Sequence, residues 1–180
     1  DLPDKMEDLR YCRLLPGQEA VYRSIHAQYS QEIVDLLRDE SQEIPYMHIF
    51  ALLTRLKQVC DHPALVNEGE GKASESAKME IFDEILDEAL DGGLQVVVFS
   101  QYVKMIDLLS KHLDRRKTAH LVLTGETRDR GRIIRRFNSE QHESILLASL
   151  LAGGVGIDLT GASVVADELE LSMLNSGLGM

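Results

Sequence analysis

The chain has 180 residues, 44% hydrophobic and 27% charged, a composition typical of one soluble globular domain with its own core. The net charge of −11 argues against uniform attraction to nucleic acid, and no apolar run approaches the about 20 residues of a membrane span. Two cysteines without CxxC spacing, Cys12 and Cys60, argue against a disulfide framework or a metal site. No signal-peptide stretch opens the chain, so we expect a cytoplasmic or nuclear protein without a membrane partner.

The first part of the chain is expected to be helical. Pro16 suits a first helical turn, and apolar residues then recur at helical spacing from Gln18 to Leu37. A second helix is predicted from Tyr46 to Cys60, because the following His62-Pro63 disfavours its continuation. Residues 67–75 are polar and rich in glycine, so they are predicted to form a loop. Residues 1–66 would therefore form a helical subdomain leading into the next domain.

From residue 76 onward the pattern predicts alternating helices and strands. Ser76 can cap a helix that ends near Leu90. Another helix is expected with Val103, Ile106, Leu109 and Leu113 in register on its inner side, and a further one from Arg128 to Asn138. Short apolar runs predict strands at residues 94–99, 120–123, 144–148 and 163–166. This alternation predicts an α/β domain over residues 76–180, with a parallel sheet covered by helices on both faces.

Charge is unevenly distributed along the chain. Residues 104–136 contain 10 Lys/Arg and 4 Asp/Glu, whereas residues 137–180 contain no Lys/Arg and 6 Asp/Glu. Composition alone favours a solvated helix face for the basic segment, although it could also meet a polyanion.

Ligands of parallel sheets bind at the carboxyl ends of the strands, where two predicted loops carry polar groups. Ser100 and Gln101 follow the first strand, and their hydroxyl, amide and backbone N–H groups could meet an anion. Gly125, Thr127 and Arg130 follow the second, where they could hold phosphate oxygens. Taken alone, the first loop is better explained by simple helix capping, and the alternative for the second is a helix cap with exposed charges.

A third loop, residues 152–160, has glycines at Gly153, Gly154 and Gly156, which suggests a tight bend near a ligand. It also carries Asp158 and Thr160. It matches neither a Walker loop nor a GxGxxG fingerprint.

Seven segments in order resemble the C-terminal RecA-like lobe of Swi/Snf-type DNA-dependent ATPases of helicase superfamily 2. They cover about residues 1–166 and comprise Leu2-Pro3 with Lys5 and Glu7, Leu14 to Tyr22, Leu56-Lys-Gln-Val-Cys-Asp-His-Pro63, Ser76-Ala-Lys78, Val96-Val-Val-Phe-Ser-Gln-Tyr102, Gly125 to Asn138, and Leu147-Ala-Ser-Leu-Leu-Ala-Gly-Gly-Val-Gly-Ile-Asp-Leu-Thr160. The resemblance implies a RecA-like fold, ATP hydrolysis with Mg²⁺ stimulated by duplex DNA, and translocation along DNA.

The resemblance also implies roles for single residues. Gly154, Gly156 and Asp158 would line the nucleotide cleft, whereas the phosphate cradle and magnesium carboxylates would come from the N-terminal lobe of the same protein. The DNA phosphates would be contacted by Ser100, Gln101, Gly125, Thr127, Arg130 and Thr160, with Ser100 and Thr127 at the ends of adjacent strands. Lys78 is a weaker candidate and could equally be a surface lysine. Protein partners from a remodelling or transcription complex are expected.

Two departures from the family pattern affect these expectations. Asp158 stands where the family usually has Asn, and residues 167–180 do not match its continuation into motif VI with paired arginines. We therefore expect a lobe truncated before motif VI and inactive toward ATP alone, with no catalytic residue of its own. Three alternatives stay open: an RNA-directed superfamily-2 helicase, a free-standing nucleotide- or sugar-phosphate-binding enzyme, and a non-catalytic α/β interaction module.

Overall fold

The computed structural model describes residues 9–38, 46–66, 75–139, 144–153, 159 and 162–166. The chain divides into two compact units, residues 1–81 with 170–180 and residues 82–169. We call them the helical unit and the sheet unit. Their division falls inside helix α3 (Ala77–Asp91), whose first residues belong to the helical unit.

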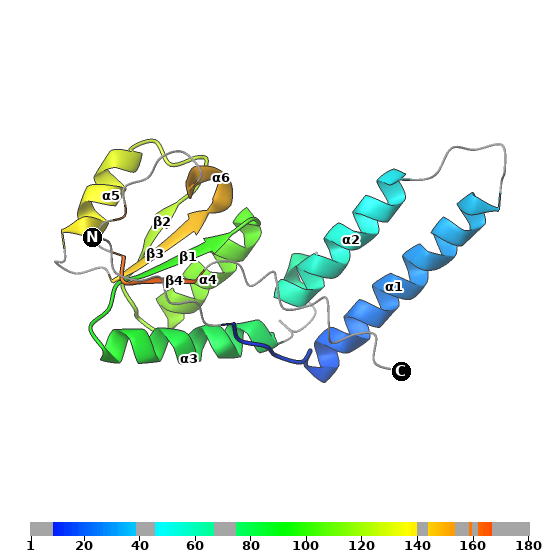
Figure 1. The fold of residues 1–180 in the computed structure, drawn as a ribbon, viewed down its shortest axis with the longest axis horizontal. Helices are drawn as coiled ribbons and strands as arrows, with labels where there is room; N and C mark the ends of the chain where they lie inside the picture. The colour runs from blue at the N-terminus through cyan, green and yellow to red at the C-terminus, as the bar shows by residue number, and fades with distance from the viewer. Residues whose placement is uncertain are drawn as a thin grey trace. The chain divides into compact units, whose positions relative to one another are not determined.

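The helical unit is built on a pair of neighbouring helices, α1 (Pro16–Leu37) and α2 (Tyr46–Asp61), as Figure 1 shows. Both predicted helices are confirmed. Pro16 is the first residue of α1, where its missing N–H costs nothing. The buried side of α2 includes Leu52, Leu56 and Val59. A short 3₁₀ helix, η1 (Pro63–Leu65), follows α2.

A buried polar cluster joins the ends of α1, α2 and α3 within the helical unit. The fully buried Gln18 donates from Nε2 to the carbonyl of Val59 at 3.1 Å, and its Oε1 accepts the amide of Ala77 at 3.0 Å. The hydroxyl of Ser76 donates to the carbonyl of Asp61 at 2.6 Å. Ser76 precedes α3 as predicted, but the first amide of that helix is bonded by a side chain of α1.

The described residues of the sheet unit form four strands, β1 (Val96–Ser100), β2 (Leu121–Leu123), β3 (Ile145–Ser149) and β4 (Val164–Ala166), in the order β2-β3-β1-β4. All three strand pairs are parallel, which confirms the predicted parallel sheet. Strand β1 begins two residues later than predicted. The chain turns at Gly93, where φ is +67°, and Leu94 is left exposed.

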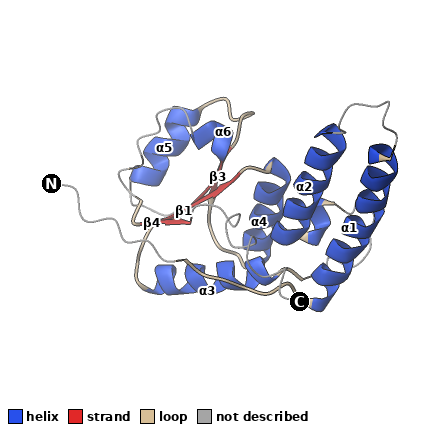
Figure 2. Ribbon diagram, turned by 45° about the vertical axis from the view of Figure 1, so that its right-hand side comes forward, coloured by secondary structure: helices blue, strands red, loops and turns tan. Residues whose placement is uncertain are grey.

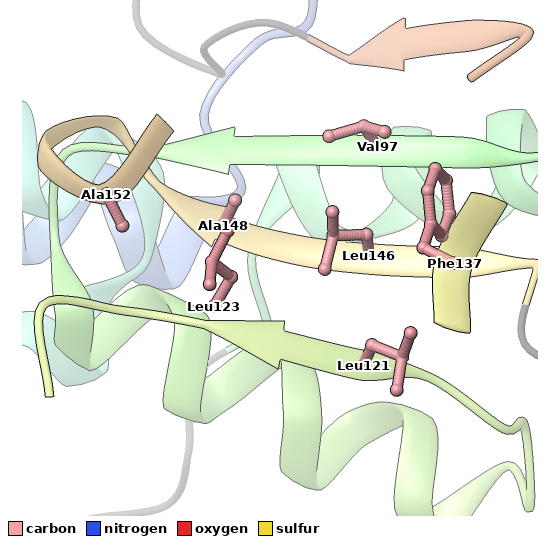
Figure 3. Packing of buried hydrophobic residues seen from close by; sticks show 7 residues of the cluster. All are labelled: Val97, Leu121, Leu123, Phe137, Leu146, Ala148 and Ala152. Carbon is pink, nitrogen blue, oxygen red and sulfur yellow. The ribbon is translucent and has the colours of Figure 1, made fainter. Parts of the chain in front are cut away.

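Helices cover both faces of this sheet (Figures 1 and 2). Besides α3, they are α4 (Val103–Arg115), α5 (Arg130–Asn138) and the short α6 (Leu150–Gly153). Figure 3 shows the apolar cluster on one face, made of Val97, Leu121, Leu123, Phe137, Leu146, Ala148 and Ala152. Helix α4 packs against β1 and β3 with Met105, Ile106, Leu109 and Leu113 buried. Val103, expected inside, is exposed because Met105 occupies the inward position.

An ionic network holds α3 to the end of α4 inside the sheet unit. Asp83 is bonded by His112 Nε2 at 2.8 Å and by the guanidinium of Arg116, which also reaches Asp87. Burial lowers the pKa of Arg116, but the hydrogen bonds and charges of the two carboxylates outweigh it, so the pKa is raised. Arg116, directly after α4, therefore helps to hold α4 to α3 through these ion pairs.

Candidate nucleic-acid interface

The loops after β1, β2 and β3 leave the sheet at one edge because these strands are parallel. We call this surface the carboxyl edge and define it by residues 100–102, 124–130 and 149–153. Strand β3 lies between β1 and β2, so the expectation that Ser100 and Thr127 follow adjacent strands is wrong. Sequence order did not reveal this crossover, which places a third loop between the two predicted phosphate loops.

Ser100 and Gln101 occupy different environments at this edge. The Ser100 side chain is buried, and its Oγ accepts the amide of Tyr102 at 3.1 Å. This bond closes the turn into α4, as expected of a local capping serine. Gln101 is exposed. Of these two candidates, Gln101 is the one whose side chain can reach a ligand directly.

Ser149 is a structural partner of Ser100 that the sequence interpretation missed. The two serines face each other in the β1–β3 register, and both are buried. Oγ of Ser149 accepts the amide of Ala152 at 3.3 Å, so it helps to close the turn into α6. The two central strands thus end in the same way, with a buried serine bonded to an amide two or three residues on.

Thr127 and Gly125 shape the loop after β2. Oγ1 of Thr127 accepts the amide of Thr124 at 2.9 Å, and the Thr127 amide donates to the Thr124 carbonyl at 3.2 Å. The hydroxyl hydrogen of Thr127 therefore stays available for an anionic acceptor. Gly125 is exposed, its φ lies outside the left-handed region, and an added Cβ would meet nothing within 4 Å. The backbone of this loop is open to close approach by a ligand.

Arg130 is the first residue of α5 and is partly exposed. Asp129 caps this helix by accepting the amide of Arg132 at 3.0 Å, and Arg132 Nε lies 3.8 Å from the same carboxylate. Within the part of the chain that the structure describes, no carboxylate lies at ion-pair distance from Arg130. The neighbouring Arg128 is exposed. Among the described residues, Arg130 thus has no carboxylate partner, and it follows Thr127 by three positions.

The third predicted loop is described only in part. Gly154, Gly156, Asp158 and Thr160 lie outside the described residues. Leu159 is described, and it packs against the apolar cluster of Figure 3.

Lys78 is neither a surface lysine nor available to a phosphate. Its side chain is buried, and Nζ lies 2.7 Å from Oδ1 of Asp61, which is buried too. Asp61 and the neighbouring Gln18 were not selected as functional residues, because no local pattern distinguishes a buried polar residue from an exposed one. The block that contains Asp61, His62 and Pro63 thus meets Lys78 through a buried ion pair.

Burial controls the chemistry of the thiol and imidazole beside this ion pair. Burial raises the pKa of the Cys60 thiol to about 12, which keeps it protonated and unreactive near neutral pH. Burial lowers the pKa of His62, whose Nδ1 accepts the amide of Ala64 at 3.0 Å. The Cys60 thiol and the His62 imidazole therefore have structural roles.

Metal sites and membrane spans are not found among the residues that the structure describes. These residues contain no group of three or more His, Cys, Asp or Glu side chains suited to a metal ion. None of the helices that they form has the length and apolar character to cross a bilayer.

The sequence matches the helicase conserved C-terminal domain over residues 77–169. It is 31% identical to the human DNA excision repair protein ERCC-6, over 91% of this chain and 12% of that protein. It is 30% identical to human SWI/SNF-related matrix-associated actin-dependent regulator of chromatin subfamily A member 1, over 91% of this chain and 16% of that protein. The chain thus spans less than a fifth of the length of these relatives.

Two solved structures from Sulfolobus solfataricus share the fold. The SWI2/SNF2 ATPase C-terminal domain matches with a TM-score of 0.79 and 30% identity, over 91% of this chain and 78% of that chain. The SWI2/SNF2 ATPase core in complex with dsDNA matches with a TM-score of 0.80 and 33% identity, over 93% of this chain and 35% of that chain. The chain belongs to the helicase conserved C-terminal domain family and is a lobe of the SWI2/SNF2 ATPase type.

Proposed function

We propose that this chain is the C-terminal lobe of an ATP-driven translocase or remodeller that moves along double-stranded DNA. The single observation that carries the proposal is the likeness to the Sulfolobus ATPase core, which was solved with dsDNA and is 33% identical over 93% of this chain. The accessible polar groups of the carboxyl edge are of the kind that bind the phosphates of a DNA backbone. Duplex DNA, the N-terminal lobe of the same protein and members of a remodelling or transcription complex are the proposed partners.

The carboxyl edge would hold the DNA backbone through hydrogen bonds and charge. Gln101 and Thr127 offer side-chain donors, Gly125 offers an open backbone, and Arg130 offers a cation without a carboxylate partner among the described residues. Ser100 would act indirectly by fixing the turn that presents Gln101. Such contacts carry little sequence information, which suits a protein that moves along DNA of any sequence.

The nucleotide would be bound between this lobe and its N-terminal counterpart. Gly154, Gly156 and Asp158 are the proposed contacts on this side, and Thr160 is proposed to face DNA. ATP and Mg²⁺ would supply the phosphoryl-transfer chemistry, which requires a phosphate cradle and a magnesium carboxylate. Those parts are proposed to lie in the N-terminal lobe. The 180-residue chain alone would then leave ATP intact.

ATP hydrolysis by the full-length protein tests this proposal. We expect turnover to rise on addition of duplex DNA and to stay at its basal level with duplex RNA. Stimulation by RNA would instead favour an RNA-directed helicase. Nucleotide turnover that responds to neither duplex would contradict a translocase, and the absence of turnover would favour an interaction module.

A further inference from the structure

Helix α2 has apolar side chains on both of its sides. Leu52, Leu56 and Val59 are buried, as expected for the side that packs within the helical unit. On the other side lies a stripe of large apolar residues whose exposed fractions range from 50% to 78%. They are Tyr46, Met47, Phe50 and Leu53. We call these four residues the α2 stripe.

The spacing of the α2 stripe places its members on one face of the helix. Tyr46, Phe50 and Leu53 are separated by four and three residues, which is the repeat of neighbouring positions on a helix surface. A helix that is apolar on both sides is normally covered on both sides. Single exposed apolar residues are common, but a contiguous patch of them marks an interaction site.

The neighbouring helix α1, which lies beside α2 in Figure 2, shows that this exposure is not general in the helical unit. Its surface is polar, with Arg23 paired with Glu19 at 2.5 Å and Gln31 bonded to Asp35 at 3.1 Å. Val34 is the one exposed large apolar side chain among its described residues. Of these two helices, α2 therefore carries most of the exposed apolar surface.

Charge identifies the chemistry of the missing partner. The exposed ionic side chains of α2 are the cations Arg55 and Lys57, since its one carboxylate, Asp61, is buried against Lys78. Arg55 lies over the ring of Tyr29, 5.9 Å from its centroid, on the side that faces α1. Lys57 follows Leu53 by four residues and continues the α2 stripe by one turn. The stripe thus ends in a positive charge and carries no negative one.

We propose that the α2 stripe is a docking site for an amphipathic acidic helix of a partner protein. Apolar side chains of that helix would cover Tyr46, Met47, Phe50 and Leu53, and a carboxylate one turn beyond would meet Lys57. A second copy of this chain fits less well, because its α2 would bring another cationic surface and no carboxylate. Charge complementarity would guide association, and the apolar contacts would supply most of the affinity.

The test uses the 180-residue chain and two synthetic helical peptides about five turns long with leucines at heptad spacing. One peptide carries glutamates at its outer positions and the other carries lysines. Fluorescence anisotropy measures the affinity of each. We expect the acidic peptide to bind, and the double variant Met47→Ser/Phe50→Ser to weaken binding by at least about tenfold. Both side chains are exposed, so thermal unfolding should be unchanged.

Two further variants separate docking from nonspecific adhesion. Leu9→Ser removes an equally exposed apolar side chain elsewhere and should leave binding unchanged. Lys57→Glu should lower the affinity for the acidic peptide and raise the affinity for the basic peptide. Failure of both peptides to bind, preference of the parent chain for the basic peptide, or equal loss with Leu9→Ser would overturn the proposal. Self-association in sedimentation equilibrium that Met47→Ser/Phe50→Ser abolishes would identify a second copy as the occupant instead.

Discussion

Lys78 Nζ lies 2.7 Å from Asp61 Oδ1, and both side chains are almost completely removed from solvent. This ion pair connects the end of α2 to the first turn of α3 within the helical unit. Removing Lys78 takes the positive charge away from a buried carboxylate, which costs far more than the pair itself contributes.

Lys78→Met should therefore lower the free energy of unfolding by about 3–5 kcal/mol. Urea denaturation of the 180-residue chain measures the change. Lys57→Met, at an exposed position of the neighbouring helix, is the matched control and should stay within about 0.5 kcal/mol. The double variant Lys78→Met/Asp61→Leu should recover much of the loss, because the buried carboxylate is removed together with the lysine. A small effect of Lys78→Met alone would show that the pair is accessible to water.

Leu146→Ala should destabilise the sheet unit by about 2–5 kcal/mol, because Leu146 is fully buried on β3 between two other strands. The substitution leaves a cavity in the cluster of Figure 3, which also contains Val97. Chemical denaturation measures the loss. The control Val165→Ala, at an exposed position on edge strand β4, should change stability by under about 0.5 kcal/mol. Similar values for the two variants would contradict the assignment of β3 to the interior.

Ser100→Ala should mainly lower stability, whereas Gln101→Ala should mainly lower DNA affinity. Ser100→Ala removes the acceptor of the Tyr102 amide and should cost about 1 kcal/mol of stability. Gln101 is exposed, so Gln101→Ala should leave stability unchanged while lowering the DNA affinity of the full-length protein. Urea denaturation and a DNA-binding titration measure the two effects. Greater destabilisation by Gln101→Ala would reverse the roles given to these neighbours.

Acid should weaken the helical unit through His62. Burial lowers the pKa of His62 in the folded chain, whereas an unfolded histidine titrates near about 6.5. Between these two pKa values the unfolded chain binds more protons, so the free energy of unfolding falls as the pH drops through that window. His62→Asn removes this contribution and should flatten the dependence of stability on pH below about 6.5. His26→Asn, at an exposed position of α1, is the matched control, and an equal slope for parent and His62→Asn would contradict the prediction.

Much of the fold could be predicted from the sequence because its periodic signals are strong. The valine-rich run of β1, the apolar run of β3 and the spacing in α1 and α2 identify buried strands and helices directly. Strand order could not be read in this way, because it depends on where each crossover helix packs. The loops after β1 and β2 are consequently separated by β3.

The candidate site was predicted less completely. Residue type identified Thr127 and Arg130 as polar groups at the carboxyl edge but did not separate the buried Ser100 from the exposed Gln101. The role of Lys78 depends on a partner 17 positions away in the sequence, which no local motif specifies. Ser149 could have been suspected, since it ends an apolar run in the same way as Ser100.

The salt dependence of DNA binding by Arg130→Ala in the full-length protein tests the central claim most directly. If Arg130 binds a phosphate, this variant should bind duplex DNA more weakly. The plot of log affinity against log salt should also become less steep, by about 0.9 for each phosphate that is no longer neutralised. DNA-stimulated ATP hydrolysis should fall while ATP binding is retained. Arg23→Ala, an exposed arginine of α1, should leave the slope unchanged. An unchanged slope together with unchanged stimulation for Arg130→Ala would show that Arg130 is a solvated charge at the start of a helix.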